Sequence, residues 1–158
     1  MNKDTQKKDT KIQAALNKLI SDEWFAGQMY KQFIIAVDPA ERSQIAAQMT
    51  DTAIDELADH MKNLIDFALS HGFDVPATYN EMKKYADKDD VKVFESVKTG
   101  QPAIFYVKKA IESEKRAITT YQKYVDDYDF AYDFQDMKVI VQSNYFDEID
   151  HLDNFEFI

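Results

Sequence analysis

No cysteine occurs among the 158 residues of this chain, and this absence excludes disulfide bridges, thiolate metal sites and thiol catalysis. Glycine and proline are scarce, with three of each, and a shortage of these turn-forming residues favours long helices over a turn-rich β fold. The sequence also lacks an apolar run of the about 18 residues that a transmembrane helix needs, and nothing near its N-terminus resembles a signal peptide. We therefore expect a soluble cytoplasmic protein without a membrane partner.

Positive charge is also in short supply, because 19 lysines and arginines face 29 aspartates and glutamates and leave a formal net charge of −10. Such a charge argues against nucleic-acid binding by the folded body. It is compatible with attracting cations, although it also simply favours solubility. Residues 1–11 differ, because they are polar and contain four lysines. We predict that they form a mobile N-terminal tail, for which DNA contact is a weaker alternative to an ordinary frayed terminus.

Apolar residues make up 45% of the sequence, enough for the core of one compact domain. From Ile12 onward they recur with the alternating spacing of four and three residues that is typical of a core-facing helix. The sequence therefore predicts an all-α domain over residues 12–158. Its four predicted helices cover approximately residues 12–37, 39–71, 102–126 and 137–155.

Residues with strong preferences for helix ends mark the boundaries. Asp38 and Pro39 suit an N-cap and a first helical position, so the second helix begins almost directly after the first. Gly72 is suited to end that second helix. Residues 73–101 follow, with a short predicted helix over 79–85, and can span the length of the bundle at about 3.3 Å per extended residue. We predict a four-helix bundle with one long crossover between helices two and three.

One glutamate interrupts the apolar stripe of each predicted helix, close to its middle. A single such side chain usually reaches solvent, but four at one height would each cost several kcal/mol if buried without a partner. Their stripes carry no lysine or arginine, whereas His151 shares the stripe of the last helix. Metal ions would neutralise the carboxylates, and carboxylate with imidazole ligands suits iron or manganese. We therefore predict a two-metal site in the core. The four glutamates are Glu23, Glu56, Glu114 and Glu148.

Three segments resemble motifs of the ferritin-like superfamily, and those of bacterioferritin and related non-haem ferritins most of all. They are EWFAGQMY (Glu23–Tyr30), EKRAITTY (Glu114–Tyr121) and DEIDH (Asp147–His151). The resemblance covers nearly the whole chain from Ile12. It implies a ferritin-like four-helix bundle that holds a di-iron site, with manganese as the alternative metal.

The resemblance also implies a role for each candidate residue. Glu56 and Glu148 would bridge the two metal ions. Tyr30 and Tyr121 would lie beside the site, where a phenol can hydrogen-bond a ligand or donate an electron. The remaining metal ligands would be Glu23, His60, Glu114 and His151.

The second helix departs from the family motif, because DELADH (Asp55–His60) places its histidine four residues after Glu56 rather than three. Asp59 occupies the motif position but falls on a polar row of the predicted helix, whereas His60 shares the apolar face. We therefore predict His60 as the ligand and Asp59 as an acid that flanks it. A local π-bulge would also bring His60 into position.

Three further features bear on haem, assembly and the remaining histidine. Leu57 stands where bacterioferritin carries its haem-ligating methionine, so we expect no haem. The chain ends seven residues after His151, which leaves no room for the fifth helix usual in 24-subunit shells. We therefore favour a 12-subunit homo-oligomer, with a dimer as the alternative. His71 lies at a predicted helix end, where a capping role is expected.

The leading functional hypothesis is a ferroxidase, which binds Fe(II), oxidises it with dioxygen or peroxide, and stores or detoxifies the iron. A second hypothesis keeps the metals but not the storage shell, and describes a dimeric peroxide-reducing or substrate-oxidising enzyme. A third describes a non-catalytic helical interaction module in which the glutamates are remnants of a lost site. Metal binding and assembly state distinguish the three.

Overall fold

The computed structural model describes the backbone of residues 3–158 and the side chains from Thr10 onward. Every regular element in this range is helical, and no β-strand occurs in it. None of the helices in these residues is both long and apolar enough to cross a membrane. The bundle consists of α1 (Lys3–Ala36), a composite second helix of η1 (Pro39–Gln44), α2 (Ala46–Ile54), η2 (Asp55–His60) and α3 (Met61–Ser70), then α6 (Ala103–Asp126) and α7 (Gln135–Glu156).

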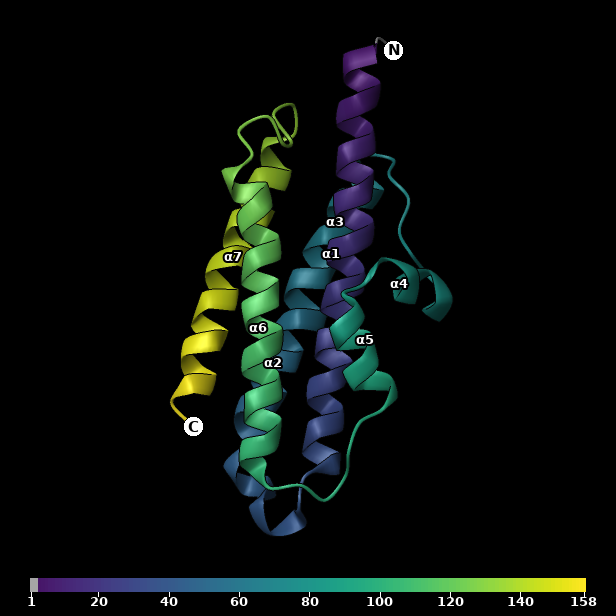
Figure 1. Cartoon of the computed structure of the whole chain (residues 1–158). Helices are drawn as coiled ribbons and strands as arrows, with labels where there is room; N and C mark the ends of the chain where they lie inside the picture. The colour runs from purple at the N-terminus through teal and green to yellow at the C-terminus, as the bar shows by residue number, and fades with distance from the viewer. Residues whose placement is uncertain (1–2) are drawn as a thin grey trace.

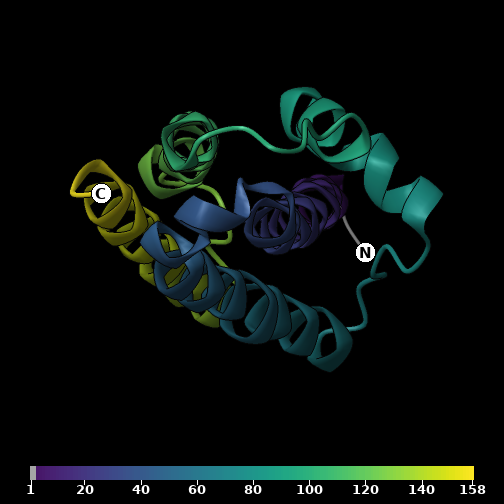
Figure 2. The ribbon, with the colours of Figure 1, turned by 90° about the horizontal axis from the view of Figure 1, so that it is seen from below.

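The chain runs up and down the bundle in the predicted order. In Figure 1, α1 descends from the N-terminus and the second helix returns antiparallel beside it. The crossover descends along α1, so that α6 ascends parallel to the second helix before α7 completes the bundle. The view in Figure 2 shows the crossover helices on the side of α1 away from α7. The predicted one-crossover topology is therefore confirmed.

Local capping explains where the second helix begins and ends. The Asp38 side chain accepts a hydrogen bond from a backbone N–H of the first turn, and Pro39 occupies the first helical position. At the other end, Gly72 has a φ of +77°, the left-handed conformation that glycine adopts without strain. His71 is the C-cap residue just before it, and its ring contacts Asp136 of α7 at 2.7 Å. Both predicted boundaries are confirmed.

The first helix begins at Lys3, nine residues before the predicted start at Ile12. The polar residues before Ile12 carry no apolar stripe, so periodicity could not reveal that they continue the helix. Residues 1–2 lie outside the described part of the chain. The predicted mobility of residues 1–11 stays a prediction.

The crossover contains two short helices where one was predicted. α4 (Tyr79–Tyr85) confirms the predicted helix, whereas α5 (Lys88–Glu95) lies in a charged stretch whose apolar face is only one turn long. Asp87 is the N-cap of α5, because its carboxylate accepts hydrogen bonds from the N–H groups of Asp89 and Asp90. Both helices pack on the outer face of α1 through a small apolar cluster of Trp24, Phe25, Met82, Ala86, Val91 and Phe94.

The bundle core consists of two apolar clusters, one toward each end of the molecule. On α1, Leu16 and Leu19 belong to one cluster, and Met29 and Phe33 belong to the other. Glu23 lies between them in the sequence and is itself buried. The two clusters therefore enclose a layer of polar side chains in the middle of the bundle.

Candidate metal centre

The polar layer contains the six residues that the sequence analysis proposed as metal ligands. All six are buried, and each of the four long helical segments contributes at least one of them. Their ligand atoms form two groups, and within each group all of these atoms lie within 4.8 Å of one another. The residues are Glu23 on α1, Glu56 and His60 on η2, Glu114 on α6, and Glu148 and His151 on α7.

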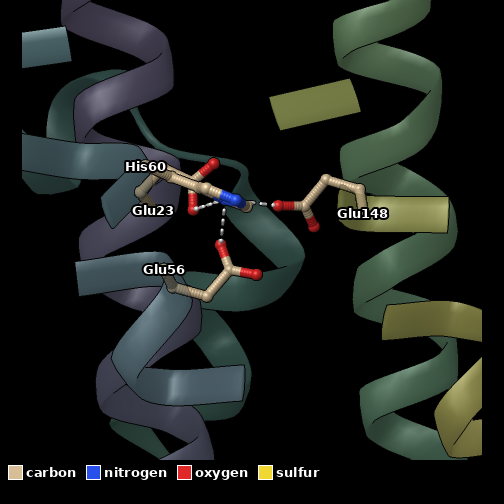
Figure 3. Close-up of side chains that lie close together, drawn as sticks. All are labelled: Glu23, Glu56, His60 and Glu148. Carbon is tan, nitrogen blue, oxygen red and sulfur yellow. Dashed lines mark ion pairs between the residues drawn. The ribbon is translucent and has the colours of Figure 1, made fainter. Parts of the chain in front are cut away.

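The first group surrounds the Nδ1 atom of His60, as Figure 3 shows. This nitrogen lies 3.0 Å from Oε1 of Glu148 and 3.7 Å from Oε2 of Glu56. Glu23 of α1 completes the group, with its Oε2 atom 3.5 Å from the same nitrogen. Three carboxylates and one imidazole thus converge from three helical segments.

The second group surrounds the Nδ1 atom of His151 in the same way. This nitrogen lies 3.1 Å from Oε1 of Glu56 and 3.9 Å from Oε2 of Glu148. Glu114 of α6 completes the group at 3.8 Å. Glu56 and Glu148 therefore belong to both groups and present one oxygen atom to each histidine.

A π-helical turn explains how His60 reaches the site. η2 spans DELADH, and its wider turn accommodates one residue more than an α-helical turn between Glu56 and the histidine. The π-bulge considered from the sequence is therefore present. Asp59, the residue directly before His60, is exposed and belongs to neither group of ligand atoms.

Two aspartates instead contact the far sides of the histidine rings, and the sequence analysis missed both. Nε2 of His60 lies 2.9 Å from Oδ2 of Asp147, and Nε2 of His151 lies 2.9 Å from Oδ2 of Asp55. Each aspartate directly precedes a glutamate that both groups share, so the repeated Asp-Glu dipeptide was the available signal. A hydrogen bond at Nε2 leaves Nδ1 as the nitrogen that faces the carboxylates and fixes the orientation of the ring.

The two predicted tyrosines lie beside the outer carboxylates in a matching arrangement. The Tyr30 hydroxyl donates a hydrogen bond to Glu114 at 2.5 Å, and the Tyr121 hydroxyl donates one to Glu23 at 2.6 Å. Asn144 in turn donates to the Tyr121 hydroxyl at 3.1 Å. Burial and the nearby carboxylate charges raise the pKa of both phenols well above the ordinary value. Each phenol therefore remains a donor that orients one glutamate.

Several buried atoms of the site have no hydrogen-bond partner among the described residues. They all face the interior of the site: Oε2 of Glu23, Oε1 of Glu56, Oε2 of Glu114, both carboxylate oxygens of Glu148, and Nδ1 of His60 and of His151. Buried polar atoms left without partners are costly, so the arrangement fits metal ions as the missing partners. Oxygen and imidazole donors in this number suit two iron or manganese ions.

In the metal-free protein, bound protons neutralise part of the negative charge of these side chains. Burial disfavours protonation of the histidines, but the adjacent carboxylates of Glu148 and Glu56 outweigh it and raise the pKa of His60 to about 12 and that of His151 to about 11. Burial and the charge of Glu148 raise the pKa of Glu114 well above its ordinary value. Burial would raise the pKa of Glu148, but the adjacent Glu114 carboxyl group and both histidines outweigh it and lower that pKa. A metal ion must therefore displace protons to bind.

Comparison with known proteins identifies the family. The family model described as the ferritin-like domain matches residues 13–158. The chain belongs to the ferritin-like family. Among solved structures, the dodecameric thioferritin of Bacteroides fragilis, a bacterioferritin-related protein, matches this ferritin-like protein with a TM-score of 0.75. The alignment covers 94% of this chain and 83% of the other at 17% sequence identity, which supports the shared fold alone. No protein with a curated description matches the sequence.

The family and the geometry together characterise the centre of this ferritin-like protein. It is a buried carboxylate and histidine site with places for two metal ions, enclosed by a helical bundle. The predicted fold class and family are therefore confirmed. The identity of the metal and the individual ligand roles stay predictions.

Proposed function

We propose that this ferritin-like protein is a ferroxidase that binds two Fe(II) ions as substrate and oxidises them for storage or detoxification. The observation that carries the proposal is the pair of adjoining groups that share Glu56 and Glu148. Two ions held by common bridging carboxylates lie close enough to deliver two electrons to one oxidant molecule.

The proposed reaction balances with dioxygen or with peroxide as the oxidant. Two Fe(II) ions lose one electron each, and dioxygen takes up both electrons and two protons to give hydrogen peroxide. When hydrogen peroxide is the oxidant, the same two electrons and two protons give two water molecules. The protein residues bind and orient the ions, while Tyr30 and Tyr121 hold the outer carboxylates in place.

We further propose that the protein assembles as a 12-subunit shell in which the oxidised iron is stored. The dodecameric state of the thioferritin with a similar fold supports this proposal. Exposed apolar side chains also offer contact surface for neighbouring subunits, among them Ile35, Ile54, Leu69 and Val139. Light scattering before and after iron loading tests it. A mass of twelve 18.4-kDa subunits with retained iron is expected, whereas a dimer without retained iron would favour the peroxidase or oxidase hypothesis.

An anaerobic Fe(II) titration of the native protein and of Glu148→Gln tests the metal site. Two ions per subunit are expected in the native protein. The variant should lose most of this binding, because Glu148 belongs to both groups and the amide carries no charge. Equal binding near zero in both proteins would support the non-catalytic interaction module.

The matched control is Asp59→Asn, which removes an exposed carboxylate one residue from His60. Its stoichiometry should equal that of the native protein. Loss of one ion in this variant would show that Asp59 is a ligand after all. Admission of air to the anaerobic complex should then oxidise the bound iron in the native and control proteins alone.

A further inference from the structure

A narrow cavity lies between the metal centre and the crossover. At its inner end the cavity is lined by glutamates of the centre: Glu23, Glu56, Glu114 and Glu148. At its outer end it is lined by Asp22, Asp87, Asp90 and Arg116. Its volume of about 20 Å³ corresponds to about one water molecule, so it has room for a single ion or water but not for an organic substrate.

The outer end is built where helix α5 begins. Asp87, the N-cap of α5, donates a hydrogen bond from its backbone N–H to Oδ1 of Asp22 at 2.7 Å. This bond attaches the start of α5 to α1, beside which the crossover lies in Figure 1 and Figure 2. Asp90 follows in the first turn and is buried.

Arg116 of α6 closes this end by pairing with both crossover aspartates. Its Nη2 atom lies 2.6 Å from Oδ1 of Asp90, and its Nε atom lies 3.2 Å from Oδ1 of Asp87. Among the described residues, Arg116 is also the one side chain that lines both this cavity and the larger cleft of about 470 Å³ between α5 and α6. The guanidinium therefore lies between the open cleft and the cavity at the metal centre.

The cavity has the chemistry of a route for cations. Toward the metal centre from the guanidinium, the cavity is lined by glutamates with oxygen atoms that have no hydrogen-bond partner. Beside the guanidinium, the carboxylates of Asp87 and Asp90 line the same cavity and can bind a cation. A divalent ion that takes over these carboxylates would release Arg116, and the guanidinium could swing into the larger cleft, which it already lines.

We propose that Asp87, Asp90 and Arg116 form a gate through which divalent cations reach the metal centre from the crossover side. The gate rests on the proposed function, because it supplies the ions that the centre binds. Arg116 sets the rate of access, and the two aspartates are the carboxylates that an ion meets once it passes the guanidinium.

Substitutions of the two partners of the ion pair should change the rate of metal binding in opposite directions. Co(II), which does not react with oxygen under these conditions, is mixed with the protein in a stopped-flow spectrometer, and the rate and the final stoichiometry are recorded. Arg116→Gln removes the positive charge of the guanidinium and should accelerate binding by about threefold to tenfold. Asp90→Asn removes one of the two carboxylates that pair with the guanidinium and should slow binding by a similar factor. The final stoichiometry should not change in either variant.

Lys115→Gln is the matched control, because it removes the same charge from the neighbouring exposed position of α6. Its binding rate should equal that of the native protein. Asp87→Asn provides a second variant on the acidic side, since asparagine retains the N-cap of α5, and it should slow binding as Asp90→Asn does.

The outcomes separate the gate from the proposed function. Rates that change in the same direction in Arg116→Gln and Asp90→Asn would show that the ion pair only anchors α5, and would overturn the gate. Unchanged rates with two ions bound would do the same and leave the proposed function intact. A native protein that binds no Co(II) at equilibrium would overturn both.

Discussion

Each histidine of the metal centre is held on its far side by an aspartate from the facing helix. Asp147 of α7 holds His60 of η2, and Asp55 of η2 holds His151 of α7. The two pairs are reciprocal, so each of the Asp-Glu dipeptides provides one carboxylate that belongs to both groups and one residue that orients the histidine of the facing helix. Loss of either aspartate should therefore weaken one half of the centre.

Asp147→Ala should lower the affinity for one of the two metal ions by about tenfold to a hundredfold, because His60 loses the partner that fixes its orientation. Asp55→Ala should do the same for the other ion through His151. An anaerobic Co(II) titration followed by visible absorption measures both affinities. Asp150→Ala, an exposed residue one turn from Asp147 on α7, is the control, and an equal effect there would contradict the prediction.

The raised pKa values of His60 and His151, about 12 and about 11, predict how metal binding depends on pH. Both rings are protonated at neutral pH in the metal-free protein, so each must release a proton before Nδ1 can bind a metal ion. The affinity for each ion should therefore rise by about tenfold per pH unit for each proton released between pH 6 and 8. Co(II) titrations at several pH values measure this slope, and an affinity independent of pH would contradict it.

The same shifts have the opposite consequence for the metal-free protein. A group whose pKa is raised by folding stabilises the folded state while it is protonated. This contribution is complete below the ordinary histidine pKa of about 6.5 and is lost as the pH rises through about 11 to 12. Metal binding and the stability of the metal-free fold therefore respond to alkaline pH in opposite directions.

At the scale of the elements, the π-helical turn η2 determines which residue of the second helix faces the centre. A π-bulge contains one residue more than the α-helix that could replace it, so the flanking helices α2 and α3 would keep their orientation if that residue were deleted. The side chain that faces the centre then depends on which residue is removed. The position of a deletion therefore distinguishes a functional bulge from an incidental one.

Deletion of the exposed residue Ala58 should preserve the fold and both metal ions, because it converts the second helix to Glu56-x-x-His in an α-helical turn. Deletion of the exposed residue Lys62 should also allow a straight helix, but it leaves His60 four residues after Glu56 and rotated away from the site. Circular dichroism and anaerobic Co(II) titration measure the outcomes. We expect two ions for the first variant and one for the second. Equal stoichiometry in both would show that η2 does not set the ligand position.

The close approach of α1 to η2 depends on Gly27. A Cβ atom at this position would lie 2.4 Å from Cγ of Leu57, which is shorter than the van der Waals contact distance between two carbon atoms. Gly27→Ala should therefore lower the free energy of unfolding by about 1–2 kcal/mol, since overpacking outweighs the gain in helix propensity. Denaturant unfolding measures the change. The second substitution Leu57→Ala should relieve the clash, and a loss of stability that it does not reduce would contradict this explanation.

At the scale of the whole molecule, the metal centre lies between two apolar clusters and connects all four long helical segments. Metal ions that bind only the folded protein stabilise it by mass action. The free energy of unfolding should rise by about 2.7 kcal/mol for each ion when its free concentration is one hundred times its dissociation constant. Thermal unfolding with and without Co(II) measures this rise, and Glu148→Gln should abolish most of it. A transition temperature that metal does not change would contradict the prediction.

The fold was predictable because its signals are local. The apolar stripes around Leu16 and Phe33 are repeated within one helix, and Asp38 and Gly72 act on the turns next to them. The start of α1 and the helix α5 were not predictable in this way. The first lacks an apolar stripe, and the second is charged and packs through few apolar residues.

The sequence alone therefore determined the four-helix bundle, its single crossover and the common height of the buried glutamates, because helical periodicity and capping depend on neighbouring residues. The tertiary structure decided that η2 is π-helical, that Asp55 and Asp147 contact the histidines, and that Arg116 pairs with Asp87 and Asp90 beside a cavity at the centre. These features depend on how two helices are rotated and aligned relative to each other. That alignment results from packing across the core, which no local pattern in one helix records.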